Sequence, residues 1–211
     1  MRVFVVGAAG YVGQFLCRRL VKHGHAVIGS DLARFAETVK ATGAKFFAYD
    51  LAAREELVLP AVDTIYFLSQ SPFYREVPDK VPHLFNVNVS GLATVAEAAR
   101  KAGVNKFIYT STGNVYQPSY APLVESAPIS RKDFYGLSKL AGEYVADLYN
   151  NYYDVTICRM FTIYGPYQRN MLFPKIIERV KASQTVMFEP GIDEDDLEGL
   201  KLTPTFVEDV I

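Results

Sequence analysis

A tyrosine and a lysine four residues apart are the first side chains in this sequence that suggest chemistry. Tyr135 and Lys139 lie in the segment Tyr-Gly-Leu-Ser-Lys, and on a helix this spacing puts both side chains on one face. An ammonium group near a phenol favours the phenolate, so such a tyrosine exchanges a proton near neutral pH. The same spacing is common on solvated helices, so the pair needs support from other residues.

Hydroxyl side chains at the end of an expected strand give that support. Thr110, Ser111 and Thr112 close the apolar segment that begins at Lys106. Ligands of open α/β sheets bind at the carboxyl ends of the strands. A hydroxyl there can hydrogen-bond the substrate oxygen that a tyrosine protonates or deprotonates. The three residue types together indicate a hydride-transfer site.

A glycine turn follows the first apolar segment of the chain. Residues 7–13 have the pattern G-x-x-G-x-x-G between an expected strand and an expected helix. The glycines allow a tight turn and the approach of a pyrophosphate, and the helix N-terminus offers unpaired N–H groups. Because the strand–turn–helix context is present, the pattern indicates a dinucleotide site rather than a packing turn.

Two aspartates follow the next two expected strands. Asp31 ends the second strand, where a carboxylate can accept hydrogen bonds from both adenosine ribose hydroxyls and repel a 2′-phosphate. This favours NAD over NADP, although the nearby Arg34 weakens the preference. Asp50 follows the third strand and is placed to meet the adenine amino group. Aspartates of this kind are also frequent turn and helix-capping residues.

Composition restricts the classes of partner. The chain has 211 residues, of which 50% are hydrophobic, and its formal net charge is −1. A nearly neutral chain gives no electrostatic reason to expect nucleic acid or an anionic membrane as partner. No apolar run approaches the roughly 20 residues of a membrane span, and we expect no signal peptide.

The two cysteines also bear on location. Cys17 and Cys158 lie far apart and outside any C-x-x-C or His/Cys cluster. We therefore expect neither a disulfide framework nor a metal site, and a reducing cytoplasm fits best.

Strand and helix patterns alternate along the chain. The expected strands are 2–6, 25–30, 45–49, 63–68, 106–110 and 155–160, and the expected helices are 11–23, 84–102, 134–152 and 172–182. This alternation implies a parallel sheet with right-handed crossovers and helices on both faces. The predicted fold class is α/β, a doubly wound Rossmann sheet.

The alternation of strand and helix patterns ends after Gly165. We assign 1–168 to an NAD-binding Rossmann domain and 169–211 to the start of a substrate-binding region that is expected to be truncated. Within that region we expect an acidic surface loop at 193–198 and a strand at 206–210.

In their order and spacing these motifs resemble the extended short-chain dehydrogenases, also called the NAD-dependent epimerase/dehydratase family. The resemblance covers essentially the whole chain. It rests on 7–13, Asp31, Asp50-Leu51, 86–91, 111–116, Tyr135 with Lys139, 159–166 and 206–210. It implies NAD as cofactor and a nucleotide sugar as substrate, with UDP-glucose 4-epimerases among the similar members.

The resemblance also implies roles for single residues. Thr112 matches the catalytic hydroxyl, with Ser111 as the near alternative. Tyr135 matches the catalytic base, and Lys139 the partner that lowers the phenol pKa and holds the nicotinamide ribose. The segment 68–70 matches the part that passes the cofactor, which is usually richer in alanine. The expected cofactor contacts are Gly7, Ala9, Gly10, Tyr11, Val12, Gly13, Asp31, Asp50, Leu51, Leu68, Ser69, Gln70, Tyr135 and Lys139.

Departures from the family pattern narrow the expected chemistry. Gly113 and Asn114 stand where the 4,6-dehydratases carry an Asp-Glu pair, so we expect no dehydration. Thr162 replaces a common asparagine, and residues 203–205 lack an arginine that usually helps to bind the diphosphate. The leading prediction is a sugar-nucleotide epimerase or reductase. The alternatives are a reductase or dehydrogenase of another small carbonyl or hydroxy compound, and a protein that senses NAD without catalysis.

Related proteins pair through the helices near 84–102 and 134–152, so the resemblance implies a homodimer. An apolar and aromatic stripe on the second helix gives modest support; it contains Tyr144, Val145, Leu148, Tyr149 and Tyr152. A stripe of this kind is more often part of the chain's own core.

Overall fold

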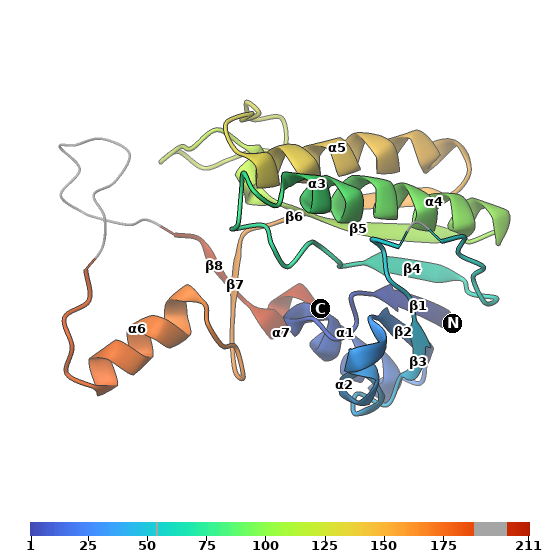
Figure 1. The fold of residues 1–211 in the computed structure, drawn as a ribbon, viewed down its shortest axis with the longest axis horizontal. Helices are drawn as coiled ribbons and strands as arrows, with labels where there is room; N and C mark the ends of the chain where they lie inside the picture. Colours follow the sequence, from blue (N-terminus) through green and yellow to red (C-terminus); the bar gives the residue numbers. More distant parts are fainter. Residues whose placement is uncertain (54, 188–201) are drawn as a thin grey trace.

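A parallel sheet of six strands forms the centre of the molecule, in the order β3-β2-β1-β4-β5-β6 (Figure 1). The computed structural model describes residues 1–53, 55–187 and 202–211. The strands are β1 (Arg2–Val6), β2 (Ala26–Asp31), β3 (Lys45–Ala48), β4 (Thr64–Phe67), β5 (Lys106–Thr112) and β6 (Asp154–Met160). This order confirms the predicted doubly wound fold. It reverses between β1 and β4, so the ligand crevice is expected at the carboxyl ends of these strands.

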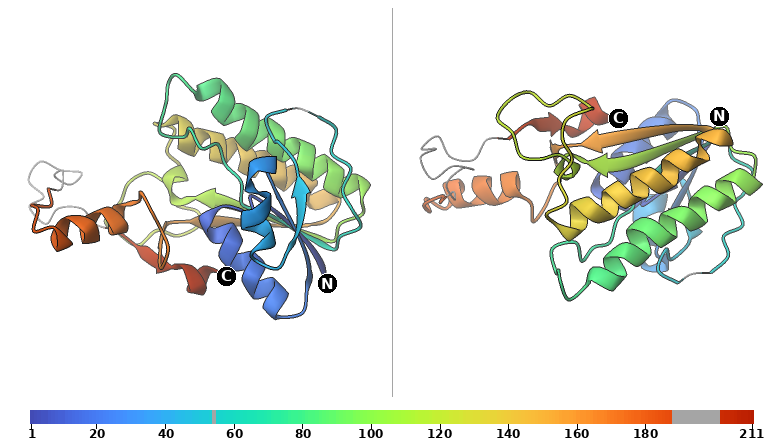
Figure 2. Two further views of the ribbon diagram at one scale, coloured as in Figure 1. Left: turned by 60° about the horizontal axis from the view of Figure 1, so that its bottom comes forward. Right: turned by 90° about the horizontal axis from the view of Figure 1, so that it is seen from above.

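Helices cover both faces of the sheet. On one face lie α1 (Tyr11–Lys22) and α2 (Ala36–Lys40). On the other lie α3 (Val81–Phe85), the π-helical segment Asn86–Gly91, α4 (Leu92–Lys101) and α5 (Phe134–Leu148). Figures 1 and 2 show α4 and α5 side by side along the sheet.

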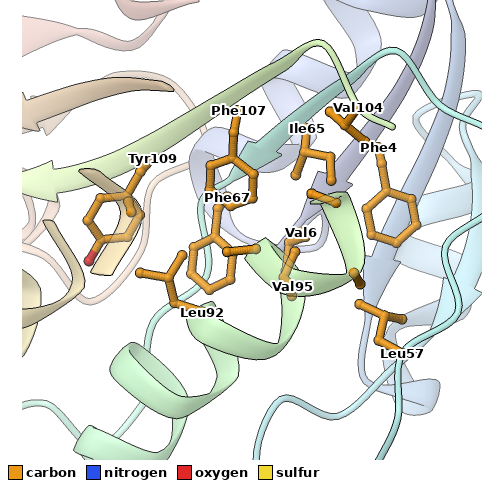
Figure 3. Packing of buried hydrophobic residues seen from close by; sticks show 14 of the residues in the cluster. Phe4, Val6, Leu57, Ile65, Phe67, Leu92, Val95, Val104, Phe107 and Tyr109 are labelled. Atoms are coloured by element: carbon orange, nitrogen blue, oxygen red, sulfur yellow. The ribbon is translucent and has the colours of Figure 1, made fainter. Parts of the chain in front are cut away.

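The core explains why β1 is apolar at successive positions. Val3 and Val5 pack toward α1, whereas Phe4 and Val6 belong to the cluster beneath α4. Figure 3 shows how this second cluster fills the space between the sheet and α4; it includes Leu92, Val95, Phe67, Phe107 and Tyr109. A strand buried on both faces needs apolar residues at both odd and even positions, and the sequence shows this pattern.

The expected single helix at 84–102 is interrupted. Asn86–Gly91 forms a π-helical turn between α3 and α4. This turn carries Asn88, which is fully buried. At its end, a side chain on Gly91 would begin 2.9 Å from the Cβ of Leu51, so only glycine fits against that loop. π-Helical turns of this kind are frequent near functional sites.

The C-terminal part consists of small elements outside the main sheet. Strands β7 (Thr162–Tyr164) and β8 (Pro204–Phe206) pair in parallel, and α6 (Leu172–Lys181) lies away from the main sheet (Figure 1). The predicted strand at 206–210 is wrong, because the strand ends at Phe206 and α7 (Val207–Val210) follows. Val207 is fully buried while the next two residues are exposed, and α7 packs beside α1. The predicted acidic loop at 193–198 lies outside the described residues.

Smaller differences concern helix ends and short turns. The helix expected at 134–152 ends at Leu148 and continues as the 3₁₀ turn Tyr149–Asn151. Gly24 has a φ of +79° directly after the end of α1, as its predicted role of helix terminator requires. The short helix α2 and the strand β7 carry too few residues for a periodic pattern, and the sequence did not predict them.

Candidate functional site

The glycine turn brings the start of α1 and the end of β4 into close contact. Gly7 has a φ of +83°, and a Cβ on it would lie 2.9 Å from the main-chain nitrogen of Ser69. A Cβ on Gly13 would collide with the carbonyl oxygen of Gly7. Helix α1 begins directly after Gly10 and receives no side-chain cap. The glycines therefore allow the main chain of the turn to pack closely, next to uncapped N–H groups that suit a pyrophosphate.

Asp31 is fixed against this turn by two main-chain N–H groups. Its Oδ2 accepts a hydrogen bond from Ala9 N (2.9 Å) and its Oδ1 accepts one from Leu32 N (2.9 Å). Each carboxylate oxygen has a second lone pair, so both can still accept a ribose hydroxyl. The guanidinium of Arg34 lies over the ring of Phe35, 4.9 Å from its centroid. The ribose role of Asp31 stays a prediction that this geometry fits.

Asp50 and Leu51 occupy a turn beside Asp31. Asp50 is exposed, and its Oδ1 accepts a hydrogen bond from Ala52 N (2.8 Å), so it caps its own turn. Leu51 is buried in the core against Gly91, which leaves its main chain for any contact with a ligand. Tyr49 N donates to Asp31 O (3.0 Å) and ties this turn to the end of β2.

Tyr135 lies in the first turn of α5, where Asp133 is the N-cap and accepts a hydrogen bond from Gly136 N (2.7 Å). The hydroxyl of Tyr135 donates to Oε1 of Gln70 (2.8 Å). Its ring packs against Tyr74, with 5.1 Å between the ring centroids. Both contacts come from the segment after β4. The sequence analysis predicted that residues 68–70 of this segment contact the cofactor, and it predicted no contact with the phenol.

The protonation of Tyr135 differs from the expectation. Burial raises the pKa of Tyr135 to about 12, while a hydrogen bond with Thr112 acts in the opposite direction. That bond places Thr112, at the end of β5, beside the phenol, as predicted for the catalytic hydroxyl. The protein groups alone do not produce the low phenol pKa that the Tyr–Lys spacing suggested, because the desolvation of Tyr135 is the dominant effect.

Lys139 is almost fully buried, at 2% exposure. Its Nζ lies 4.6 Å from the centroid of the Tyr109 ring. Burial lowers the pKa of Lys139 to about 7, and the nearby Glu143 opposes that change. An ammonium group with so little solvent gains from any acceptor that a ligand brings, such as a ribose hydroxyl.

Ser111, the alternative to Thr112, takes part in another hydrogen-bond network. Its Oγ donates to Oε1 of Glu143, one turn of α5 beyond Lys139. Arg159 on β6 pairs with the same carboxylate, with Nη2 2.7 Å from Oε2, and its Nη1 donates to the Tyr116 hydroxyl (2.8 Å). The sequence analysis did not single out Glu143. Its signal is the spacing of four residues that continues along α5 from Tyr135 through Lys139 to Glu143.

A second network holds the main chain of Tyr135. Ser138 Oγ donates to the carbonyl oxygen of Tyr135 (2.8 Å) and accepts from Nδ2 of Asn88 (2.9 Å). Asn88 Oδ1 accepts from Ser71 N (2.8 Å). The π-helical turn thus connects the segment after β4 to the start of α5, and the sequence gave no local signal for this connection.

The structure also gives a reason for Gly113, where the dehydratases carry an acid. A Cβ at this position would lie 2.6 Å from the ring of Phe161, so an aspartate would require that ring to move. In the described part of the chain, no His, Cys, Asp and Glu side chains gather in threes to hold a metal ion. Nor does that part contain a helix long and apolar enough to cross a membrane.

Comparisons with known proteins agree with this geometry. The model of the NAD dependent epimerase/dehydratase family matches residues 3–197. The chain belongs to this family. NAD is the cofactor in the family's description, as the sequence predicted.

Two curated members of the family show high similarity. A UDP-glucose 4-epimerase of Mycolicibacterium smegmatis is 34% identical over 182 residues, which is 80% of this chain and 58% of the relative. An uncharacterized UDP-glucose epimerase of Bacillus subtilis is 30% identical over 196 residues, which is 85% of this chain and 62% of the relative. The chain thus spans about three fifths of the length of these relatives.

Solved structures of the family superpose on the whole chain. UDP-glucuronic acid 4-epimerase from Bacillus cereus, in complex with UDP-glucuronic acid and NAD, has a TM-score of 0.84 at 25% identity, covering 100% of this chain and 70% of its own. UDP-glucose 4-epimerase from Thermus thermophilus, in complex with NAD, has a TM-score of 0.81 at 27% identity, covering 100% and 72%. These matches confirm the predicted Rossmann fold.

Proposed function

We propose that this protein is an NAD-dependent epimerase of a UDP-sugar. The observation that carries the proposal is the meeting of Thr112 and Tyr135 at the carboxyl end of β5, on the same sheet edge as the glycine turn. The two relatives and two structures described above are all named as UDP-sugar epimerases. The proposal includes the predicted cofactor contacts at 7–13, Asp31, 50–51 and 68–70.

The chain's own residues handle the proton in this reaction. NAD, when bound at the glycine turn, would supply the hydride chemistry at the sugar carbon. Tyr135 as phenolate accepts the proton of the sugar hydroxyl, and Thr112 orients that oxygen by a hydrogen bond. Lys139 lies one turn along α5 and would hold a ribose hydroxyl of the cofactor with its ammonium group. After the ketone sugar turns its opposite face to the cofactor, Tyr135 returns the proton to the same oxygen, so the carbon is inverted without net oxidation.

Two other functions remain as alternatives. A reductase or dehydrogenase of another carbonyl compound would use the same three side chains, and Thr162 with residues 203–205 departs from the usual substrate contacts. A protein that only senses NAD would not need Thr112 beside the Tyr135 phenol.

The test incubates the protein with NAD and UDP-glucose or UDP-glucuronic acid and analyses the sugar nucleotides by chromatography, while the NADH absorbance is followed. Formation of the 4-epimer without net NADH supports the proposal. Stoichiometric NADH indicates a dehydrogenase, and cofactor binding without product from either sugar would refute the epimerase.

We also propose that the protein is a cytoplasmic homodimer. The two cysteines are free, and burial raises the pKa of both thiols, which suits a reducing compartment. Large apolar side chains on α5 and directly after it are exposed on the single chain, among them Tyr144, Leu148 and Tyr152. A second copy would cover them.

A further inference from the structure

Gln70 lies in the segment after β4, and its side chain reaches the phenol of Tyr135. The hydroxyl of Tyr135 donates a hydrogen bond to its Oε1 at 2.8 Å. An apolar side chain at this position would have no group to accept that proton.

The main chain around Gln70 is held in place on both sides. Before it, the nitrogen of Ser69 packs against Gly7 of the cofactor turn. After it, Ser71 N donates to the buried amide of Asn88, and Ser71 Oγ lies 2.9 Å from Nδ1 of His83. A carboxamide on such an anchored segment keeps its position without the ligand, which is the requirement for preorganisation.

The groups around the phenol are few and come from three elements. Tyr74, on the same segment as Gln70, packs on the ring, and Asp133 stands at the start of α5. The Thr112 hydroxyl approaches from β5, and Lys139 follows one turn along α5. Among these groups the Gln70 carbonyl accepts the phenol proton, and an acceptor stabilises the neutral phenol but not the phenolate.

We propose that Gln70 is a further catalytic residue, whose carboxamide oxygen holds the phenol proton of Tyr135 until a substrate hydroxyl displaces it. The inference rests on the proposed function of Tyr135 as the proton acceptor. Before substrate binds, Gln70 keeps the phenol neutral and oriented toward the crevice. When the sugar hydroxyl arrives, the amide gives up its position at Oη, the phenol proton leaves to solvent, and the resulting phenolate accepts the proton of the substrate hydroxyl.

The test compares Gln70→Met with Gln70→Glu. Methionine keeps the length of the side chain but cannot accept the proton, so Tyr135 should titrate at lower pH by about half a unit to one unit. Glutamate adds a negative charge beside the phenol, so Tyr135 should titrate at higher pH by at least about one unit. Because a merely structural role of Gln70 would not give opposite shifts, the pair of variants separates the two readings.

Ionisation is followed by the NMR signal of the Tyr135 Cζ carbon, which is assigned by its loss in Tyr135→Phe. The range is limited to pH values at which circular dichroism shows an intact fold. Gln184→Ala, which removes an exposed amide beyond α6, serves as the control and should leave the midpoint unchanged. If Gln70→Met fails to fold, Gln70→Asn replaces it, because its shorter amide should also move the midpoint to lower pH. If Gln70→Glu fails to fold, Gln70→Asp replaces it and should still move the midpoint to higher pH.

A lower midpoint in Gln70→Met together with a higher one in Gln70→Glu supports the proposal. Any other pair of shifts overturns it, including a higher midpoint in Gln70→Met, which would mean that the amide donates to the phenolate instead. This readout needs no turnover. If the activity test refutes the epimerase, the titration of Tyr135 still decides the role of Gln70. If the titration refutes the role of Gln70, the activity test still decides the epimerase.

Discussion

Because Lys139 is buried, its ionisation should make the free energy of unfolding depend on pH. Burial lowers its pKa to about 7 in the folded chain, against about 10.4 when unfolded. Between these values the unfolded chain binds a proton that the folded chain does not, so stability rises with pH in this window. Below about pH 7 both forms are charged and the folded state carries the full cost of burying the ammonium group.

Lys139→Met should therefore remove that slope. We expect the free energy of unfolding of the unchanged protein, relative to Lys139→Met, to increase from pH 7 to pH 10 by up to about 1.4 kcal/mol per unit. Urea unfolding of the NAD-free protein, followed by circular dichroism, measures this. The exposed Lys175→Met is the control and should show no relative slope. A flat difference across the range would show that Lys139 keeps an ordinary pKa.

The reaction should depend on the phenol oxygen rather than on the ring. Tyr135→Phe keeps the contact with Tyr74 but removes the atom that bonds Gln70 and Thr112. We expect kcat to fall about 10²- to 10⁴-fold, as for loss of a general acid–base group, with NAD binding retained. Turnover of UDP-glucose and calorimetric titration with NAD are the two measurements.

Its control is Tyr167→Phe, which changes a tyrosine that is 86% exposed and should keep full activity. Activity of Tyr135→Phe within a factor of two or three of the unchanged protein would contradict the role proposed for this hydroxyl.

Residue type and spacing identified Tyr135 and Asp31, and the resemblance to the family selected Thr112, because each follows the start or end of a regular element. Gln70 and Tyr74 were not recognisable as partners of the phenol. Their contact with it depends on how closely the segment after β4 approaches α5, which is set by buried Asn88 and Ser138 and not by a local pattern.

At the scale of elements, one carboxylate joins α5, β5 and β6. Glu143 is 6% exposed and bonds both Ser111 and Arg159, whose side chain is 24% exposed. Glu143→Gln should destabilise the protein by about 3 kcal/mol, because it leaves a largely buried guanidinium without its counter-charge. The double variant with Arg159→Met should lose less than the sum of the two single changes.

Equilibrium unfolding in urea checks this, with Glu97→Gln as the matched control. Glu97 pairs with Arg100 on the surface of α4, where both side chains are about 40% exposed. An exposed pair of this kind contributes well under about 1 kcal/mol. Equal losses in the two variants would mean that the Glu143 pair is no more important than a surface one.

Long elements with a regular period were predictable, and locally irregular ones were not. The strand Arg2–Val6 was predicted with its observed bounds because four successive apolar residues follow Arg2. The π-helical turn Asn86–Gly91 was read as ordinary helix, since apolar residues on either side keep the helical period. Val207–Val210 was read as strand, because four residues cannot show whether an apolar residue recurs every second or every fourth position.

At the scale of the whole molecule, the stripe on α5 divides into two faces. Val145 and Tyr149 pack against the chain's own core cluster, as a stripe of this kind usually does. Tyr144, Leu148 and Tyr152 are 62%, 70% and 63% exposed. The sequence could not separate these faces, because residues three and four apart along a helix share a period whether they meet the sheet or a second chain.

The exposed half predicts that two copies associate through α5. Leu148→Glu places a charge in the centre of that surface, where desolvation of an unpaired carboxylate opposes association. We expect the variant to sediment as a monomer at concentrations at which the unchanged protein is a dimer, with the same circular dichroism. Val180→Glu, a similar change on exposed α6, should leave the dimer intact. A monomeric unchanged protein, or a dimer that survives Leu148→Glu, would show that this face of α5 meets something other than its own copy.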